Sequence, residues 1–166
     1  MSGSQSIYTE AQRKRRDESP WTLVQGILAA VQFLVFLVSL ALVLRFLATG
    51  EGALVATISV VMKTIILYTI MVTGAIWERE VFGQYLFAKS FFWEDVVSMA
   101  VIALHTLYLI TLFSGLLDLT GQMYVAIAAY VVYVVNAGQF LWKFRQARLA
   151  ARPATPGLAG AEGAHP

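Results

Sequence analysis

Four polar residues that could carry chemistry recur within one apolar stretch of the sequence, at spacings of four, seven and three: Glu94, Ser98, His105 and Tyr108. At 100° per residue in a helix they fall within roughly 80° of arc, so they form one stripe. Polar groups at membrane depth are costly and tend to face the interior of a helix bundle. The stripe therefore predicts a pocket that holds both a carboxylic acid and an imidazole. The alternative is a buried histidine that only hydrogen-bonds to a neighbouring helix.

Carboxylates are concentrated where two apolar stretches meet the connection between them: Glu78, Glu80, Glu94 and Asp95. Neighbouring carboxyl groups can divide the work of a general acid and a general base. Plainer roles are open as well, because acidic groups near a helix N-terminus complement its dipole. The connection at 81–87 is too aromatic for an ordinary solvated loop. It indicates a segment that lies on the membrane interface or covers a large flat apolar ligand.

Lys63 lies in another apolar stretch, about 13 Å from the outer end of the helix that this stretch would form. A lysine near mid-membrane costs ~3 kcal/mol or more on insertion scales. It can shed its proton, its ammonium can snorkel outward to water, or it can pair with a pocket group or a carboxylate of a substrate. One arc of a further stretch carries Tyr133, Asn136, Phe140 and Lys143, and the amide and phenol groups there can serve packing or ligand binding. Three more polar residues, spaced by seven, favour interhelical hydrogen bonds: Gln25, Gln32 and Ser39.

These residues are placed by four apolar segments of about membrane-spanning length: 21–47, 54–77, 94–117 and 122–142. About 20 residues at ~1.5 Å rise cross a ~30 Å hydrocarbon core. The first and third connections are short, which makes neighbouring helices antiparallel. We therefore expect an all-α polytopic membrane protein, with an antiparallel bundle of four transmembrane helices over 21–149. A polar basic segment precedes it at 1–20, and an Ala/Pro/Gly-rich tail at 150–166 is expected to be disordered.

Composition and charge support the membrane class. Hydrophobic residues make up 58% of the 166 residues and charged residues only 13%, against ~25% charged residues in soluble domains. The absence of cysteine excludes disulfides and thiolate metal sites, and no basic stripe with interleaved aromatics indicates nucleic-acid binding. Lys and Arg flank the bundle at 13–16, 79, 89 and 143–152, whereas the first and third connections contain none. This bias predicts that both termini are cytoplasmic.

Four blocks of sequence carry a resemblance to a known family: RRDESPWTLVQG at 15–26, EREVFGQYLF at 78–87, FFWEDV at 91–96 and ALHT at 103–106. With them the chain resembles the 3-vinyl bacteriochlorophyllide hydratase family, which acts in bacteriochlorophyll synthesis in photosynthetic bacteria. The resemblance extends over about residues 13–148 and excludes both tails. One departure is Ala88-Lys89-Ser90, where the family pattern leads us to expect a proline.

The resemblance implies a hydro-lyase that hydrates the ring vinyl group of a chlorophyllide or bacteriochlorophyllide to a 1-hydroxyethyl group. The residues suit that chemistry. Protonation of the vinyl group leaves a cation that the ring delocalises, and water then adds, so the reaction needs a general acid and a general base. Desolvation at a membrane interface favours the protonated form of a carboxylic acid. We expect Glu94 to be the acid, and Asp95 or Glu78 to handle the water.

The resemblance also implies the ligands and the location. Residues expected to bind the pigment are His105, Tyr108, Ser98, Lys63 and Asn136. His105 is either an axial ligand of the pigment's magnesium or a member of a proton relay. The enzyme needs no cofactor of its own, because the substrate carries the magnesium. Its expected partners are the pigment and the lipid bilayer of the bacterial inner membrane, cytoplasmic or intracytoplasmic and photosynthetic; contact with neighbouring pigment-synthesis enzymes stays open, and nucleic acid is not expected.

Two other functional classes fit part of the pattern. A non-catalytic tetrapyrrole-binding or assembly protein would need the same pocket but no carboxylates. A small proton-coupled transporter is compatible with Lys63 and His105, although no span is visibly broken by Pro and Gly in paired halves. Haem held by two histidines of one chain is excluded, because His165 lies in the tail and only His105 is intramembrane.

Overall fold

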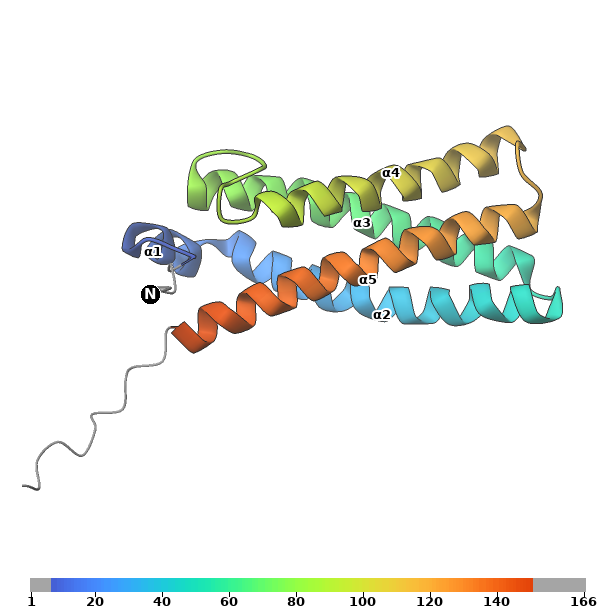
Figure 1. Cartoon of the computed structure of the whole chain (residues 1–166), viewed down its shortest axis with the longest axis horizontal. Helices are drawn as coiled ribbons and strands as arrows, with labels where there is room; N and C mark the ends of the chain where they lie inside the picture. Colours follow the sequence, from blue (N-terminus) through green and yellow to red (C-terminus); the bar gives the residue numbers. More distant parts are fainter. Residues whose placement is uncertain (1–6, 151–166) are drawn as a thin grey trace, which may run out of the picture.

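The computed structural model describes residues 7–150, and the side chains of residues 7–149, as an all-helical protein with no strand in that range. Its five helices are α1 (Glu10–Glu18), α2 (Pro20–Thr49), α3 (Ala53–Phe82), α4 (Phe92–Ser114) and α5 (Leu119–Ala150) (Figure 1). The sequence-based prediction of an all-α protein is confirmed. Apart from Ala150, which ends α5, the tail expected to be disordered lies outside the described residues.

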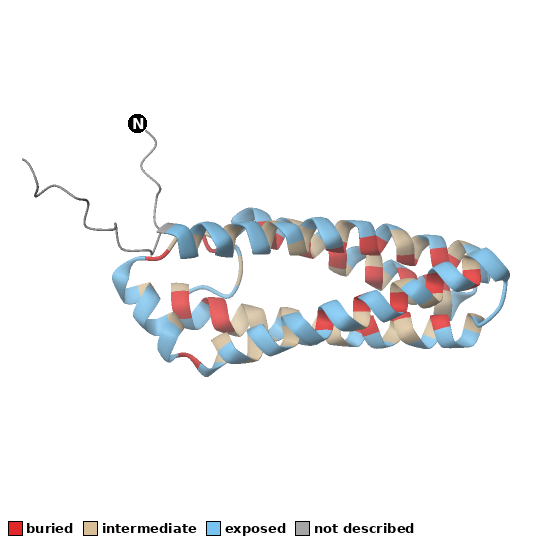
Figure 2. Cartoon of the chain, turned by 90° about the horizontal axis from the view of Figure 1, so that it is seen from below, coloured by how far each residue is buried: buried red, intermediate tan, exposed pale blue. Residues whose placement is uncertain are grey.

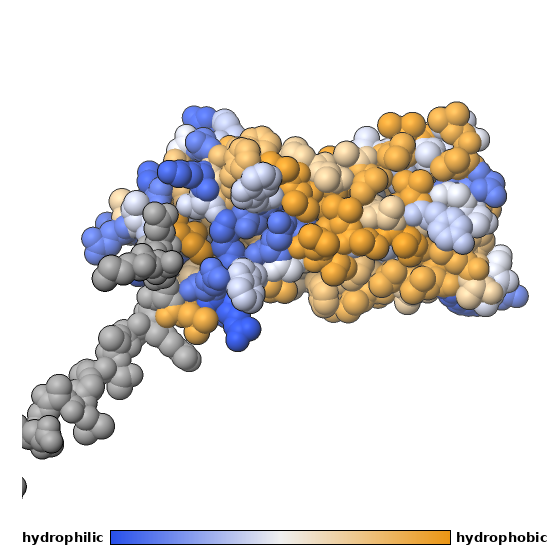
Figure 3. All heavy atoms as spheres, in the orientation of Figure 1, coloured by the Kyte–Doolittle hydropathy of each residue, from blue (hydrophilic) through white to orange (hydrophobic). Residues whose placement is uncertain are grey.

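The four long helices are each long and apolar enough to cross a membrane, as predicted. At 30 residues each, α2 and α3 measure about 45 Å, which exceeds the ~30 Å of a hydrocarbon core. Large apolar side chains point outward along them, which suits contact with lipid rather than water. Figure 3 shows apolar residues over most of the length of the molecule and polar residues gathered around the end that carries α1. We call this end the α1 end.

Four helix ends differ from the predicted spans by three residues or more, including both ends of α5, which runs from Leu119 to Ala150 where 122–142 was predicted. α3 runs on to Phe82, beyond the predicted boundary at 77, and stops where Gly83 adopts a left-handed conformation with φ 87°. α4 stops at Ser114, before the predicted 117, because Gly115 takes φ 65° and its N–H bonds to the Thr111 carbonyl. Glycine reaches this region of φ without a Cβ clash, so both residues end their helices. The longer α3 brings Glu78 inside a helix rather than at its exit.

The helices form two pairs, since α2 packs mainly against α3 and α4 mainly against α5, with fewer contacts between the pairs. The turns at 50–52 and 115–118 lie at the end opposite to α1 (Figure 1). Buried residues form stripes on the inward sides of the helices, and most of the outer surface is exposed (Figure 2). The core between the pairs includes Phe36, Val43, Val60, Val101 and Tyr130.

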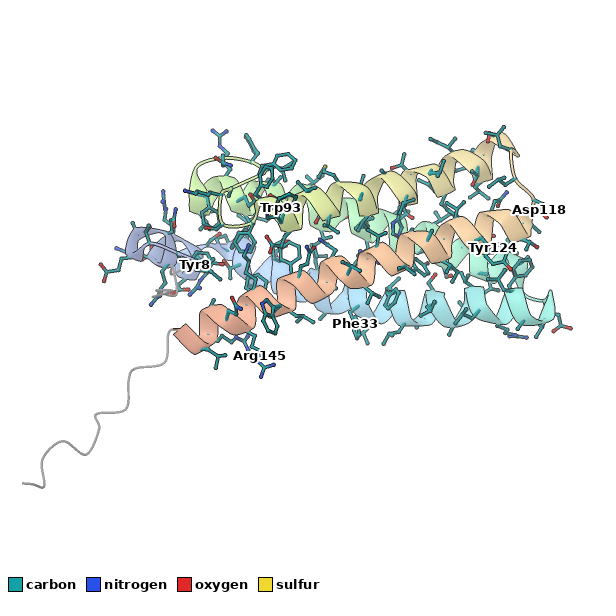
Figure 4. The ribbon with its side chains drawn as sticks, viewed as in Figure 1. Tyr8, Phe33, Trp93, Asp118, Tyr124 and Arg145 are labelled. Atoms are coloured by element: carbon teal, nitrogen blue, oxygen red, sulfur yellow. The ribbon has the colours of Figure 1, made fainter. Side chains whose placement is uncertain are left out.

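The N-terminal segment contributes an aromatic side chain to the fold. Thr9 caps α1 in a capping box with Gln12, and Tyr8 just before it is 5% exposed. The Tyr8 ring stacks on Phe82 with centroids 5.7 Å apart and contacts Phe91. We call Tyr8, Trp77, Phe82 and Phe91 the aromatic cluster. Tyr8 and Trp93 lie at the α1 end, far from Tyr124 and Asp118 (Figure 4). Thus the segment before α2 is fastened to the bundle at the α1 end.

This packing predicts that Tyr8→Ala destabilises the protein. Loss of a buried aromatic ring costs about 3–5 kcal/mol in well-packed cores, and we expect the lower part of that range because the cluster lies near an end. The midpoint of thermal unfolding in detergent measures the effect. Tyr85→Ala is the matched control, since Tyr85 is 53% exposed in the neighbouring loop. Equal midpoints for the two variants would show that Tyr8 does not hold the segment.

Candidate active site

Two carboxyl groups meet at the α1 end of the bundle. Glu78 lies one turn before the end of α3, Asp95 lies in the first turn of α4, and both are at most 5% exposed. Their carboxyl groups are near enough to share a hydrogen bond. A hydrogen bond between two carboxyl groups requires one proton, because two carboxylates have only acceptors. We call these residues the carboxyl pair, which is a ready-made proton donor beside a proton acceptor.

The connecting loop (residues 83–91) is tied to the carboxyl pair by its backbone. The N–H of Phe87 donates to Asp95 Oδ2 at 2.7 Å, and the N–H of Ala88 donates to Glu78 Oε2 at 3.2 Å. Phe87 has φ 60°, the only non-glycine residue with positive φ in the described part of the chain. For an L-residue that region costs roughly 1–2 kcal/mol. A hydrogen bond contributes about 0.5–1.5 kcal/mol, or about 1.5–3 kcal/mol when the acceptor is charged, so the two bonds together offset the strain.

Glu94, the sequence-predicted acid, is held in an ion pair. Lys143 Nζ of α5 lies 2.6 Å from Glu94 Oε2 and also donates to the Ser90 carbonyl of the connecting loop. Glu94 is 7% exposed, and its backbone carbonyl accepts hydrogen bonds from Ser98 Oγ at 2.8 Å and Asn136 Nδ2 at 2.9 Å. The structure therefore brings together the predicted residues Glu94, Ser98 and Asn136.

Lys143 is the functional neighbour that sequence reasoning left out of the site. In the sequence it belongs to the basic flank of the last span, and it shares a helical arc with Asn136. That shared arc was the available signal, because residues 136 and 143 lie two turns apart on one face of a helix. What the sequence lacked was the relative rotation of α4 and α5, which decides whether Lys143 meets Glu94 or water.

The rest of the predicted stripe forms a second polar centre deeper in the bundle. His105 lies eleven residues beyond Glu94, about 16 Å along the helix. It is fully buried, and its Nδ1 lies 2.8 Å from the Val101 carbonyl. A carbonyl only accepts, so Nδ1 carries the hydrogen and Nε2 keeps a free lone pair. Nε2 has no hydrogen-bond partner among the described residues. Tyr108, one turn further, is also fully buried.

Lys63 of α3 reaches the same depth without snorkelling. It is fully buried, and its Nζ lies 3.6 Å from the centroid of the Tyr133 ring, in a cation–π contact. The ammonium has no hydrogen-bond partner in the part of the chain that the structure describes. The structure therefore excludes outward snorkelling, one of the alternatives left open by the sequence, because the lysine points into the bundle.

The polar residues of α2 are partly satisfied between helices. Gln25 Nε2 donates to Thr73 Oγ1 at 2.6 Å, and Ser39 Oγ lies 2.7 Å from Ser59 Oγ and 2.6 Å from Tyr130 Oη. For these two residues the prediction of interhelical hydrogen bonds is confirmed. Gln32 differs, because it is 2% exposed and neither amide atom has a partner among the described residues.

Comparison with known proteins gives one consistent result. A family model described as 2-vinyl bacteriochlorophyllide hydratase matches residues 8–146. A protein of Rhodobacter capsulatus named 2-vinyl bacteriochlorophyllide hydratase is 68% identical over 146 residues, which cover 88% of this chain and 85% of the relative. One of the same name from Cereibacter sphaeroides is 67% identical over 144 residues, which cover 86% and 89%. None of the solved structures matches.

The geometry predicts that Asp95→Ala loosens the connecting loop. Without the acceptor for the Phe87 N–H, we expect amide hydrogen exchange in residues 84–90 to rise roughly tenfold or more, since a hydrogen bond to a charged group is lost. Hydrogen–deuterium exchange with mass spectrometry measures this rate. Glu80→Ala is the control, because Glu80 is exposed and holds no loop amide. An unchanged rate in Asp95→Ala would show that the loop is held by other contacts.

Proposed function

The chain belongs to the 2-vinyl bacteriochlorophyllide hydratase family, and from this premise we propose that its carboxyl pair supplies the proton for hydration of the vinyl group. The activity itself, addition of water to the vinyl group in bacteriochlorophyll biosynthesis, follows from the family, so the predicted hydro-lyase is confirmed. The non-catalytic pigment carrier and the transporter are thereby set aside. The observation that carries the mechanism is the close approach of two buried carboxyl groups, those of Glu78 and Asp95.

The reaction needs one proton donor and one proton acceptor. The proton of the carboxyl pair goes to the terminal carbon of the vinyl group, whose π electrons form the new C–H bond. The inner carbon becomes a cation that the conjugated ring delocalises. A water oxygen then bonds to that carbon, and the proton that the water loses returns to the carboxyl pair. The pair ends in its starting state, and no electrons are gained or lost.

The sequence favoured Glu94 as the acid, and its ion pair leads us to a different assignment. The Lys143 ammonium occupies a carboxylate oxygen of Glu94 at 2.6 Å, so it competes with a proton for the same lone pairs. No such ion pair forms at the carboxyl pair among the described residues, although the charge of Lys143 also acts on Asp95, and two adjacent buried carboxyl groups favour sharing one proton. We therefore assign proton transfer to Asp95 and Glu78, and assign to Glu94 the positioning of Lys143 and the connecting loop.

His105 is assigned to substrate binding rather than to proton transfer. Its separation of about 16 Å from Glu94 along α4 exceeds the distance from the magnesium to the vinyl group within one chlorin ring. If the vinyl group lies at the carboxyl pair, the magnesium is therefore too far from His105 to be ligated by it. Ser98, Asn136 and Tyr108 remain proposed pigment contacts along the face that joins the two centres. The chemistry requires no cofactor besides the pigment's own magnesium.

We propose that the four spans form an antiparallel bundle with both termini cytoplasmic. The pairing of α2 with α3 and of α4 with α5, joined by short turns, supports the antiparallel arrangement (Figure 1). Lys and Arg lie at the α1 end in α1, the connecting loop and the end of α5, which supports a cytoplasmic α1 end. The carboxyl pair then faces the cytoplasmic leaflet of the inner membrane, where lipid and neighbouring pigment enzymes are the expected surroundings.

The acid assignment predicts different outcomes for two neighbouring variants. Asp95→Asn should lower kcat by about 10²–10⁴, the usual loss when a general acid is removed. Glu94→Gln should retain kcat within about tenfold, because it leaves the carboxyl pair intact. Both are measured with purified protein in detergent and a vinyl bacteriochlorophyllide, and the hydroxyethyl product is identified by its mass.

Binding of the vinyl pigment, followed by its absorbance, is the control that both variants are folded. A large loss of kcat in Glu94→Gln together with normal turnover in Asp95→Asn would return the acid role to Glu94. Turnover of both variants at the parent rate would place the proton donor elsewhere.

The orientation predicts the location of fused reporters. Reporters placed after Arg148 and within residues 81–87 should report a cytoplasmic position, and one placed at Gly50 should report the opposite side of the membrane. Alkaline phosphatase and green fluorescent protein fusions give complementary signals. A periplasmic signal from the fusion within 81–87 would contradict the four-span topology.

A further inference from the structure

Lys63 is a buried cation whose counter-charge does not come from the described part of the chain. Its side chain is fully buried, its Nζ rests on the Tyr133 ring, and no hydrogen-bond acceptor or carboxylate lies beside it among residues 7–149. A lone charge at membrane depth is costly, and cations there are paired or line a functional site. The contact with an aromatic face offsets only part of that cost. The ammonium therefore lacks an anion.

Two more polar groups without partners lie at the same depth. Between α2 and α3, Gln25 contacts Thr73 and Ser39 contacts Ser59. In both contacts the numbers of the facing residues add to 98. By the same register Gln32 faces position 66 of α3, within one helical turn of Lys63. His105 Nε2 is the third group and lies close enough to Lys63 to feel its charge. We call Gln32, Lys63 and His105 the central polar site.

Buried polar atoms without partners are rare, and a group of them calls for a ligand. We propose that the central polar site binds the free propionate carboxylate of the substrate, an inference that rests on the proposed function. A bacteriochlorophyllide is the unesterified form of the pigment, so it carries an ionised carboxylate into the membrane. Lys63 Nζ and Gln32 Nε2 supply donors to its oxygens, which is a charge-assisted arrangement. His105 Nε2, which has a free lone pair, can accept one of the remaining N–H groups of the ammonium once the carboxylate is bound.

Charge distribution fixes the direction in which the substrate lies. Three carboxyl groups, those of Glu78, Glu94 and Asp95, are buried at the α1 end, and the nearby Lys143 is already bound to Glu94. A propionate at that end would meet like charge. The uncharged vinyl group does not, so it occupies the α1 end while the carboxylate reaches Lys63.

The length of the bundle between the two sites suits an elongated ligand. Lys63 and Glu78 are fifteen residues apart on α3, about 22 Å along the axis. Their extended side chains and the pigment, from vinyl group to propionate, together span that distance. The looser contact between α3 and α4 than within each helix pair provides the route by which a flat pigment enters between the pairs.

The test compares binding of the free acid with binding of its propionate methyl ester. In the full-length parent protein in detergent, titration followed by pigment absorbance should show that esterification weakens binding roughly tenfold to a hundredfold, the size of a hydrogen bond to a charged group. In Lys63→Met, which places an apolar side chain of similar length in the core, acid and ester should bind equally, at about the affinity of the ester for the parent. Lys89→Met is the matched control, because Lys89 is an exposed cation of the connecting loop, and it should retain the preference for the acid.

Each outcome decides the proposal. Loss of the preference in Lys63→Met alone supports it. Loss in Lys89→Met alone, or an equal affinity of the parent for acid and ester, overturns it. Gln32→Leu provides a second variant if Lys63→Met does not fold, and it should reduce the preference for the acid. The proposed acid role fails separately, if Asp95→Asn turns over at the parent rate, and that result leaves the ratio of acid to ester affinity unaffected.

Discussion

The α1 end of the protein depends on the contact between the carboxyl groups of Glu78 and Asp95. This contact joins the last turn of α3 to the first turn of α4, and the free lone pairs of the same two side chains accept the N–H groups of Phe87 and Ala88. Helix pairing, the path of the connecting loop and the proton needed for hydration therefore meet in one contact. Such a contact is stable only where water is largely excluded, because water would hydrogen-bond to each carboxyl group separately.

Exclusion of water at this end is provided by aromatic packing. Phe91 lies between the Trp77 ring and the ring of Phe140 from α5, and Tyr8 covers it from the N-terminal segment. The Trp77 indole N–H donates to Thr22 at 2.9 Å, which links α3 to the start of α2. The aromatic cluster thus does for the α1 end what lipid does for the outer faces of the spans. The carboxyl pair is therefore enclosed between the aromatic cluster and the apolar part of the bundle.

Much of the fold was accessible from sequence because the bilayer permits few alternatives. Four apolar segments of sufficient length predict four helices, and Gly50, Gly83 and Gly115 mark three of the helix ends. The stripe of α4 was also readable, because helical periodicity places Glu94, Ser98 and His105 on one face. The boundary of α3 was missed, since charged residues at 78–80 read as an exit from the membrane.

The site was only partly readable for a different physical reason. Periodicity gives the face of one helix but not the rotation of a neighbouring helix against it. The ion pair of Glu94 with Lys143 and the contact of Glu78 with Asp95 both join different helices, so neither is visible in a single stretch of sequence. The backbone donors Phe87 and Ala88 leave no trace in side-chain chemistry at all. A site built from backbone amides becomes visible only with the tertiary structure.

The use of backbone amides also determines how the connecting loop can change during evolution. Any amino acid except proline has the N–H that Asp95 and Glu78 accept, so the attachment itself does not depend on the side chains at 87 and 88. Both side chains are restricted for other reasons. The left-handed backbone at 87 disfavours β-branched residues, and Ala88 is 2% exposed, so a larger side chain there would have to displace its neighbours. A proline, which this chain lacks at 88–90, is compatible with the attachment at 89 or 90 and incompatible with it at 88. Selection on the attachment therefore acts on the backbone N–H groups at 87 and 88, which a proline would lack, more than on the chemistry of the side chains.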